Sequence, residues 1–417
     1  MFGFGKKLAA FEQRLADLEQ QTAKLEKKTK RQKKTITALE EINTQNQARL
    51  AAFEKQREQD RKTIAELEGR IKENKKLVRQ LERDLDRTKG NKIDLEKTLE
   101  VTMEKTGWDY EFAMDQFYDA RERTGCSPKE YKMYRFYDLT EAEQAEVFLM
   151  SLSKQITAKY STKNREFIAV MRNKEKTNEY FADLLGRQWC VNTKITEEEF
   201  AAKFADSKRI IYKPLLGCRG NGVEAFDVTP ENVRQIYQTL AGYDKGVVEE
   251  FVVQHPKMSE LAAASVNTIR AVTISSNTQP VTPDGKMADI AYTSLRIGGG
   301  TSIVDNLHGG GVCAAIDMDT GILVTDGVDM ESEIHTHHPY TGVKIKGFQI
   351  PFYQETKDMI LNTIRDKKIE GYLGWDIAIT ETGPVLIELN NTPGVPGLST
   401  PWVAEKKGMK HIMEKYL

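Results

Sequence analysis

A heptad repeat runs through the first quarter of the chain and constrains the possible folds more than any other feature. One register can be followed without a skip from Leu8 to Leu99. Apolar residues fill 17 of its 27 a and d positions, whereas 39% of the whole chain is hydrophobic, and no proline interrupts the run. A seven-residue period of this length predicts a left-handed coiled coil. At ~1.5 Å per residue the rod would be about 140 Å long.

Polar residues interrupt the apolar seam of this repeat. Asn43 and Arg57 occupy a positions, and Asp60 occupies a d position. Such residues lower the stability of a coiled coil but penalise wrong registers and wrong strand numbers. We favour a parallel homodimer, and a lone, highly charged helix whose seam faces water is the alternative.

The formal net charge of −1 conceals a division of charge along the chain. Residues 1–100 carry 25 Lys and Arg against 18 Asp and Glu, whereas the remainder carries 36 against 44. The positive part is also the part with the heptad pattern, so its basicity gives no case for nucleic-acid binding. We therefore expect no nucleic-acid partner.

Cysteines and apolar segments indicate the compartment. The four cysteines lie far apart without a CxxC pair, which is typical of reduced thiols in a cytoplasmic protein. No apolar stretch approaches the ~18–20 residues that span a bilayer, and the start of the chain lacks the hydrophobic core of a signal peptide. We expect a cytoplasmic protein. A start with Phe2, Phe4, Lys6 and Lys7 could touch a membrane surface, although so short an apolar anchor is a weak signal.

The rest of the chain divides into a helical region and a β-rich region. Residues 105–190 read as helical, with capped helix starts at Ser127 and Thr140. Further on, short β-rich runs alternate with helical segments at 230–241 and 353–367. We predict an α+β fold with a coiled coil over 1–104, a helical region over 105–190 and a second domain over 191–417.

A predicted β-hairpin near the C-terminus brings three oxygen-bearing side chains together. Folding about Thr382 places Asp376 opposite Glu388. Glu388 and Asn390 are two residues apart, so both point to one face. Two buried carboxylates side by side are costly unless a cation neutralises them, and oxygen ligands suit Mg²⁺. The hairpin thus predicts a Mg²⁺ site, with an edge hairpin of solvent-facing acids as the alternative.

A glycine-rich loop follows a strand that ends in lysine. Lys213 precedes a loop that contains Gly217, Gly220 and Gly222. Backbone N–H groups of such loops can close over phosphate oxygens, while the lysine supplies a point charge. No GK[ST] sequence follows, so this is not a P-loop. The loop predicts phosphate binding, although a glycine-rich hairpin turn would look similar.

Two acidic residues and two arginines extend this pattern. The run 247–252 predicts a strand whose edge could pair with an adenine, and it contains Glu249 and Glu250. Arg270 and Arg296 lie on strand-like segments and suit bidentate contacts with phosphate or carboxylate. Structural ion pairs are the alternative for both arginines.

The order of these pieces resembles the ATP-grasp superfamily, and more narrowly the sugar-transfer-associated ATP-grasp family. The resemblance covers roughly residues 105–400, and its specificity lies in the combination of pieces. It implies an ATP-grasp fold of two α+β subdomains that grip ATP, preceded by a helical region and a long N-terminal coiled coil. The matching wording includes Lys213-Pro214, Asn267-Thr268-Ile269-Arg270, Leu295-Arg296-Ile297-Gly298, Val304-Asp305-Asn306, His338-Pro339 and Gly374-Trp375-Asp376 through Glu388-Leu389-Asn390.

The resemblance also implies roles for individual residues. Asp376, Glu388 and Asn390 would ligate the Mg²⁺ ions that bridge the phosphates of ATP, and Lys213 would contact those phosphates. The other implied nucleotide-binding residues are Lys174 (or nearby Lys176), Gly217, Gly220, Gly222, Glu249 and Glu250 beside the adenine, and Glu250 or Glu260 near the ribose. The implied catalytic residues are Arg270, Arg296 and Asn306.

ATP-grasp enzymes mostly join a carboxylate to an amine, and the resemblance implies the same reaction for this chain. ATP would phosphorylate a small-molecule carboxylate, and an amine would attack the acyl phosphate. The family name suggests substrates linked to the assembly of capsule or other surface polysaccharide. A kinase with the same fold, and a coiled-coil scaffold with a non-catalytic ATP domain, are the alternatives.

Overall fold

The computed structural model describes residues 4–88, 91–215, 222–300, 310–395 and 399–417. Packing divides the chain into two units, Met1–Lys92 and Ile93–Leu417. No helix in the described part of the chain is both long enough and apolar enough to cross a membrane.

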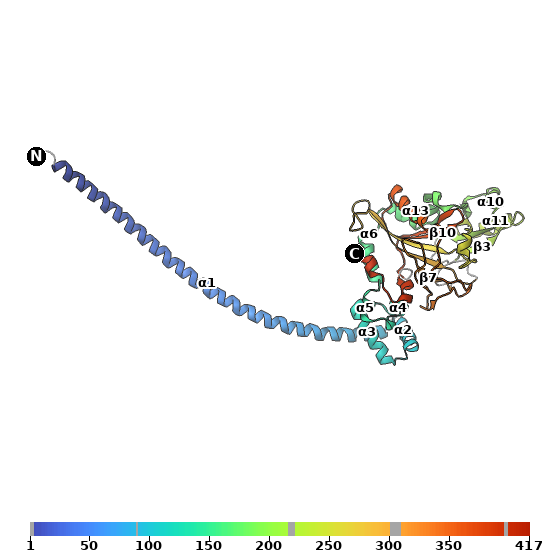
Figure 1. The fold of residues 1–417 in the computed structure, drawn as a ribbon, viewed down its shortest axis with the longest axis horizontal. Helices are drawn as coiled ribbons and strands as arrows, with labels where there is room; N and C mark the ends of the chain where they lie inside the picture. The colour runs from blue at the N-terminus through green and yellow to red at the C-terminus, as the bar shows by residue number, and fades with distance from the viewer. Residues whose placement is uncertain (1–3, 89–90, 216–221, 301–309, 396–398) are drawn as a thin grey trace. The chain divides into compact units, whose positions relative to one another are not determined.

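One continuous helix, α1 (Phe4–Thr88), fills most of the first unit (Figure 1). The long N-terminal helix predicted from the heptad register is thus confirmed, and at ~1.5 Å per residue it measures about 130 Å. The large apolar side chains that the structure describes on α1 are exposed, from Leu67 at 49% to Phe53 at 77%. The helix alone buries none of these side chains, so the coiled coil itself stays a prediction.

Short helices form the first part of the second unit. They are α2 (Asn91–Thr106), α3 (Tyr110–Thr124), α4 (Pro128–Met133), η1 (Phe136–Asp138), α5 (Glu141–Ala145), α6 (Met150–Tyr160), α7 (Arg165–Met171), α8 (Lys174–Tyr180) and α9 (Ala182–Leu185). Capping boxes at Ser127 and Thr140 begin α4 and α5, as predicted. Leu95 and Leu99, the last d and a positions of the heptad register, are buried in the core of this unit. The apolar seam therefore ends before Leu95, earlier than the predicted boundary at residue 104.

A four-stranded antiparallel sheet with the order β1-β4-β2-β3 comes next. Its elements are β1 (Trp189–Val191), η2 (Asn192–Lys194), α10 (Glu197–Phe204), β2 (Arg209–Pro214), β3 (Glu224–Asp227), α11 (Val233–Ala241) and β4 (Gly246–Glu250). Phe200 of α10 and Leu240 of α11 pack against Ile210 and Val248 of the sheet. Because β1 and β2 pair with both edges of β4, the predicted free edge for an adenine is wrong for this strand.

A seven-stranded antiparallel sheet has the order β11-β10-β5-β6-β7-β8-β9. Its strands are β5 (Thr268–Ser275), β6 (Ala288–Ile297), β7 (Val312–Ala315), β8 (Gly327–Val328), β9 (Ile334–His335), β10 (Gly371–Thr380) and β11 (Gly383–Asn390). The remaining helices are α12 (Pro256–Ser259), α13 (Tyr353–Asp366), η4 (Thr400–Glu405), α15 (Lys410–Met413) and η5 (Glu414–Tyr416). Successive residues of a strand point to opposite faces, so each strand contributes to two cores. Ile360 and Ile364 of α13 pack with Trp375 in one of them, and Val272 and Tyr372 share the other with the helical region.

These elements confirm the predicted α+β fold. The predicted hairpin is β10 and β11, and the predicted helices at 230–241 and 353–367 are α11 and α13. Each sheet with its helices forms an α+β subdomain.

Candidate active site

Four neighbouring strands bring predicted site residues into one row. Glu388 on β11 lies opposite Asp376 on β10, and Asp376 lies opposite Arg270 on β5. Arg270 in turn lies opposite Ser294 on β6, and Arg296 comes two residues later on the same face. Directly opposed residues have Cβ atoms ~4.5–5.5 Å apart. Strand pairing alone therefore gathers these side chains.

The Asp376 carboxylate is buried and is held by two arginines. Arg270 donates to both of its oxygens, from Nε at 2.6 Å and from Nη2 at 3.1 Å. Arg296 Nη1 lies 3.2 Å from Asp376 Oδ2. A buried carboxylate needs such partners because it has lost its hydration. The arginines thus form the ion pairs that were the alternative to ligand contacts.

Glu388 differs from Asp376 because it lacks a fixed partner. No hydrogen bond or ion pair joins its side chain to another described residue. Glu388 is exposed on the edge strand β11, so of the two carboxylates expected to be buried only Asp376 is, and Glu388 matches the alternative of a solvent-facing acid. Nearby protein atoms nevertheless remove part of its hydration. This loss of hydration, and then the negative charge of Asp376, raise the pKa of Glu388, while the charges of Lys174, Lys213 and Arg270 oppose the rise. A bound cation would relieve the repulsion between the two carboxylates.

The donor set on this hairpin fits Mg²⁺. Asn390 Nδ2 donates to Asp376 Oδ2 at 3.3 Å, so its amide oxygen can serve as a further hard ligand. Mg²⁺ prefers oxygen ligands and completes its octahedron with water and phosphate. Within the described ranges no group of three or more His, Cys, Asp or Glu is arranged to hold a metal ion. The ion would therefore rest on the Asp376 and Glu388 carboxylates and the Asn390 amide.

Gly374 keeps space open beside the row. It lies on β10 opposite Asn390, two residues before Asp376. A Cβ atom at this position would lie 3.1 Å from Arg270 Nη1 and 3.2 Å from Pro393 Cα. A larger residue would therefore press on the guanidinium that holds Asp376.

A second cluster of charges surrounds Glu249 on β4. Arg187 Nε and Nη2 lie 2.9 and 2.8 Å from Glu249 Oε2, and Lys213 Nζ lies 2.8 Å from the same oxygen. Asn178 Nδ2 donates to Oε1 at 2.8 Å. Burial would raise the pKa of Glu249, but the charges of Arg187 and Lys213 outweigh burial and hold the pKa well below its ordinary value. Arg187 alone neutralises Glu249, so the charge of Lys213 is in excess and can serve an anionic ligand.

Arg187 also links the two subdomains. Its Nη1 donates to the backbone carbonyl of Leu386 on β11 at 2.7 Å and to that of Leu185 at 3.0 Å. Leu386 comes two residues before Glu388. Arg187 thus connects the Glu249 cluster to the strand that carries Glu388. No local pattern marked Arg187 in the sequence, because its contacts are with residues distant in the chain.

The structure favours Lys174 over Lys176 as the early lysine of the site. Lys174, the first residue of α8, is half-buried and its charge acts on Glu388, whereas Lys176 is exposed. Glu175 between them is buried and paired with two lysines of the four-stranded subdomain. That pairing fixes the start of α8.

No hydrogen bond or ion pair joins the other predicted residues that the structure describes to these two clusters. Glu250 accepts hydrogen bonds from the Gln188 N–H and the Ser207 hydroxyl, both at 2.7 Å. Glu260 is exposed and pairs with Lys257 at 2.6 Å. These contacts are structural, and a nucleotide role for either glutamate stays a prediction. Gly222 is exposed with a φ of +72°. Phe2, Gly217, Gly220 and Asn306 lie outside the described residues.

Comparison with known proteins identifies the family. The family described as sugar-transfer associated ATP-grasp matches residues 196–416, more than half of the chain. No curated protein matches the chain.

Solved structures give distant likenesses. One is the ADP complex of N5-carboxyaminoimidazole ribonucleotide synthetase, with a TM-score of 0.33 and 9% identity over 55% of this chain and 46% of that protein. D-alanyl-alanine synthetase A from Vibrio cholerae has a TM-score of 0.34 and 11% identity over 59% and 63%. D-alanine–D-alanine ligase from Bacillus anthracis has a TM-score of 0.32 and 12% identity over 59% and 66%. The chain thus spans between about half and two thirds of the lengths of these proteins.

The matched segment contains Lys213, Glu249, Arg270, Asp376 and Glu388, whereas Lys174, Asn178 and Arg187 precede it. It also contains both sheets apart from β1. The chain belongs to the sugar-transfer associated ATP-grasp family and has the two α+β subdomains of the ATP-grasp fold.

Proposed function

We propose that this protein is an ATP-dependent ligase that joins a carboxylate to an amine, with Mg²⁺ as its cofactor. The observation that carries the proposal is the row of Glu388, Asp376 and Arg270 across three strands. A cation held by the two carboxylates would lie beside a guanidinium that can hold an anionic substrate. Family membership supports ATP as the nucleotide.

Some of the residues around this row would bind ATP, and others would bind the substrate. When bound, Mg²⁺ neutralises the phosphates and stabilises charge on the transferring phosphoryl group. Lys174 and Lys213 add positive charge close to Glu388. Arg270 and Arg296, with side chains 14% and 17% exposed, fix Asp376 and remain within reach of a substrate carboxylate.

The proposed reaction has two steps. A carboxylate oxygen attacks the γ-phosphorus of ATP, the bond from that phosphorus to the β,γ-bridging oxygen breaks, and an acyl phosphate and ADP result. The amine nitrogen then attacks the acyl carbon, phosphate leaves, and the nitrogen loses a proton. Neither step needs a nucleophilic side chain. Positioning and electrostatic stabilisation supply the catalysis.

The family description points to the chemical setting of the substrates. Because the family is associated with sugar transfer, we propose that the carboxylate or the amine belongs to a building block of capsule or another surface polysaccharide. The carboxylate substrate and the amine substrate would both be small molecules, and either can be linked to a sugar.

Product analysis tests the proposal. A ligase releases ADP and phosphate only when carboxylate and amine are both present, whereas a kinase releases ADP without free phosphate. With the carboxylate alone, ATP labelled at the β,γ-bridging oxygen should scramble its label, because the acyl phosphate forms reversibly. The proposal would be overturned if phosphate were released at the same rate with and without the amine and the oxygen label of ATP did not scramble.

A matched pair of variants tests the cation site. Glu388→Gln removes one charge from the row and should abolish turnover. Glu381→Gln makes the same change in the exposed turn of the same hairpin and should leave activity intact. Equal activity in the two variants would show that the hairpin does not hold the catalytic Mg²⁺.

A further inference from the structure

The large apolar side chains of α1 form an exposed stripe. All of those described occupy a or d positions of the heptad register except Ile42 and Leu77, which occupy the adjacent g position. Exposing such a stripe to water is unfavourable, and burying it against a partner is the main driving force for association. The stripe consists of Leu15, Leu18, Leu25, Ile36, Leu39, Ile42, Leu50, Phe53, Ile64, Leu67, Ile71, Leu77, Val78 and Leu81.

We propose that α1 pairs with α1 of a second copy of this chain as a parallel, in-register, two-stranded coiled coil. The first argument concerns strand number. The β-branched residues Ile36, Ile64, Ile71 and Val78 occupy a positions, whereas leucine is the commonest residue at d. This distribution favours two strands, and Asn43 at a further a position favours the same state.

The second argument concerns orientation and rests on charge. The described g positions include Arg14, Lys28, Arg49 and Arg70, whereas most described e positions are glutamate. In a parallel pair, a g residue faces the e residue five positions later on the other helix. Arg14 then faces Glu19 of the second copy, and Arg49 faces Glu54 of the second copy. The e-position glutamates of α1 whose side chains the structure describes are Glu12, Glu19, Glu26, Glu40, Glu54 and Glu68.

An antiparallel pair would lose this complementarity. It sets g beside g and e beside e, so the g-to-e pairs Arg14–Glu19 and Arg49–Glu54 would not form. The parallel pair does contain two like-charged contacts, because Lys28 faces Lys33 and Arg70 faces Lys75 of the second copy. They equal in number the two oppositely charged contacts, Arg14–Glu19 and Arg49–Glu54, which form only when the helices are parallel and in register.

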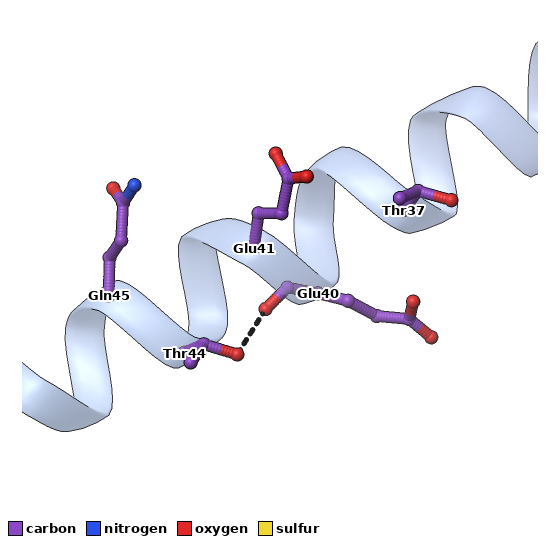
Figure 2. A pocket seen from close by; sticks show the side chains of 5 residues that line it. All are labelled: Thr37, Glu40, Glu41, Thr44 and Gln45. Atoms are coloured by element: carbon purple, nitrogen blue, oxygen red, sulfur yellow. Dashed lines mark hydrogen bonds between the residues drawn. The ribbon is translucent and has the colours of Figure 1, made fainter.

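The opposite side of α1 suits water rather than a third helix. Figure 2 shows part of it, where Thr37, Glu40, Glu41, Thr44 and Gln45 line a shallow hollow of the helix surface. Thr37, Glu41, Thr44 and Gln45 occupy b, c and f positions, Glu40 occupies an e position at the border of the apolar stripe, and all five are polar. The Thr44 hydroxyl donates to the Glu40 carbonyl at 2.8 Å, so it needs no outside partner. A face of this composition stays solvated in a two-stranded coil.

Cysteine cross-linking of the full-length protein tests orientation and register together. In the proposed dimer, Leu18 at d lies beside Leu18 of the second copy, so Leu18→Cys should form a covalent dimer under mild oxidation. Gln20→Cys, at the outward f position two residues further along the chain, is the matched control and should stay monomeric on a non-reducing gel, as should the wild type. An antiparallel pair would place the two Leu18 positions near opposite ends. Absence of a cross-link at Leu18→Cys, or an equal cross-link in the control, would overturn the proposal.

Mass and charge reversal complete the test. Light scattering should give twice the 47.4 kDa of one chain; one or three chain masses would refute the two-stranded pair. Arg49→Glu should raise the dissociation constant of the dimer several-fold, and adding Glu54→Arg should restore it. Failure of the double variant to recover would contradict the parallel g-to-e contact. None of these measurements depends on the enzymatic proposal.

Discussion

Replacing Arg187 by leucine should destabilise the globular unit by about 2–3 kcal/mol at pH 7. The side chains of Arg187 and Glu249 are 4% and 3% exposed, so water cannot replace the lost contact. The substitution removes two of the four hydrogen bonds on Glu249 and both bonds to the Leu185 and Leu386 carbonyls. Loss of one partner of a buried ion pair usually costs ~3–5 kcal/mol. We expect less, because Lys213 and Asn178 still contact Glu249.

The cost should depend on pH in a defined direction. The pKa of Glu249 lies below its ordinary value of 4.5 in the folded protein. A carboxyl with a depressed folded-state pKa contributes stability that is fully present above the unfolded-state value and is lost as the pH falls through the folded-state value. Without Arg187, burial is opposed less strongly and the pKa of Glu249 rises. The difference in stability between wild type and variant should therefore shrink below about pH 4.5.

Urea unfolding followed by tryptophan fluorescence measures this effect. All four tryptophans belong to the second unit, so the signal reports on the globular part of the full-length protein. Arg172→Leu is the matched control, because Arg172 is exposed and its loss should change stability by less than ~0.5 kcal/mol. A loss below about 1 kcal/mol for Arg187→Leu, the range of exposed ion pairs, would refute the argument. So would an equal loss at pH 7 and pH 4.

Two further substitutions probe the row of site residues. Glu388→Gln should raise the Tm of the Mg²⁺-free protein by about 1–3 °C, because a pKa raised in the folded state means that the ionised Glu388 costs stability at neutral pH. Added Mg²⁺ should then raise the Tm of the wild type but not of the variant, as measured by scanning fluorimetry. A Mg²⁺-dependent rise in the Tm of the variant but not of the wild type would contradict a Mg²⁺ site at Glu388. Gly374→Ala should lower kcat by roughly 10- to 100-fold with an unchanged circular dichroism spectrum, because its Cβ would press on Arg270. Gly394→Ala, whose Cβ would meet no described atom within 4 Å, should leave kcat unchanged, and equal losses in both variants would show that the space beside Arg270 is unimportant.

The C-terminal hairpin was predictable because its pairing is local. The turn pairs Thr380 with Gly383 and Ile377 with Leu386, and a register shift between Asp376 and Ile377 then sets Asp376 opposite Glu388. The predicted pairing is therefore confirmed, but it depends on a bulge that the alternation of the sequence did not specify. The α1 helix was predictable for a similar reason, since its seven-residue period repeats over many turns. Both features depend on residues close together in the chain.

The residues that surround Glu249 could not be predicted from neighbouring residues in the sequence. Its partners Asn178 and Arg187 lie 71 and 62 residues away, and only the folded sheets bring them close. The inner position of β4 likewise depends on strand order, which no local alternation specifies. The end of the apolar seam was misplaced because Leu95 and Leu99 keep the heptad spacing while packing in a different core. An amphipathic helix reads the same whichever surface covers its apolar side.

The helical region and the seven-stranded sheet share one core, so the segment that matches the family differs from the segment that forms the folded unit. The family match begins at residue 196. Leu99 and Phe117, which precede it, are buried in the same core as Tyr372 and Tyr416, which lie within it. A segment limited to 196–416 would leave that core uncovered. The segment that matches the family is therefore shorter than the segment that packs as one unit. A fusion protein that contains this globular unit would have to include the chain from Ile93 onward.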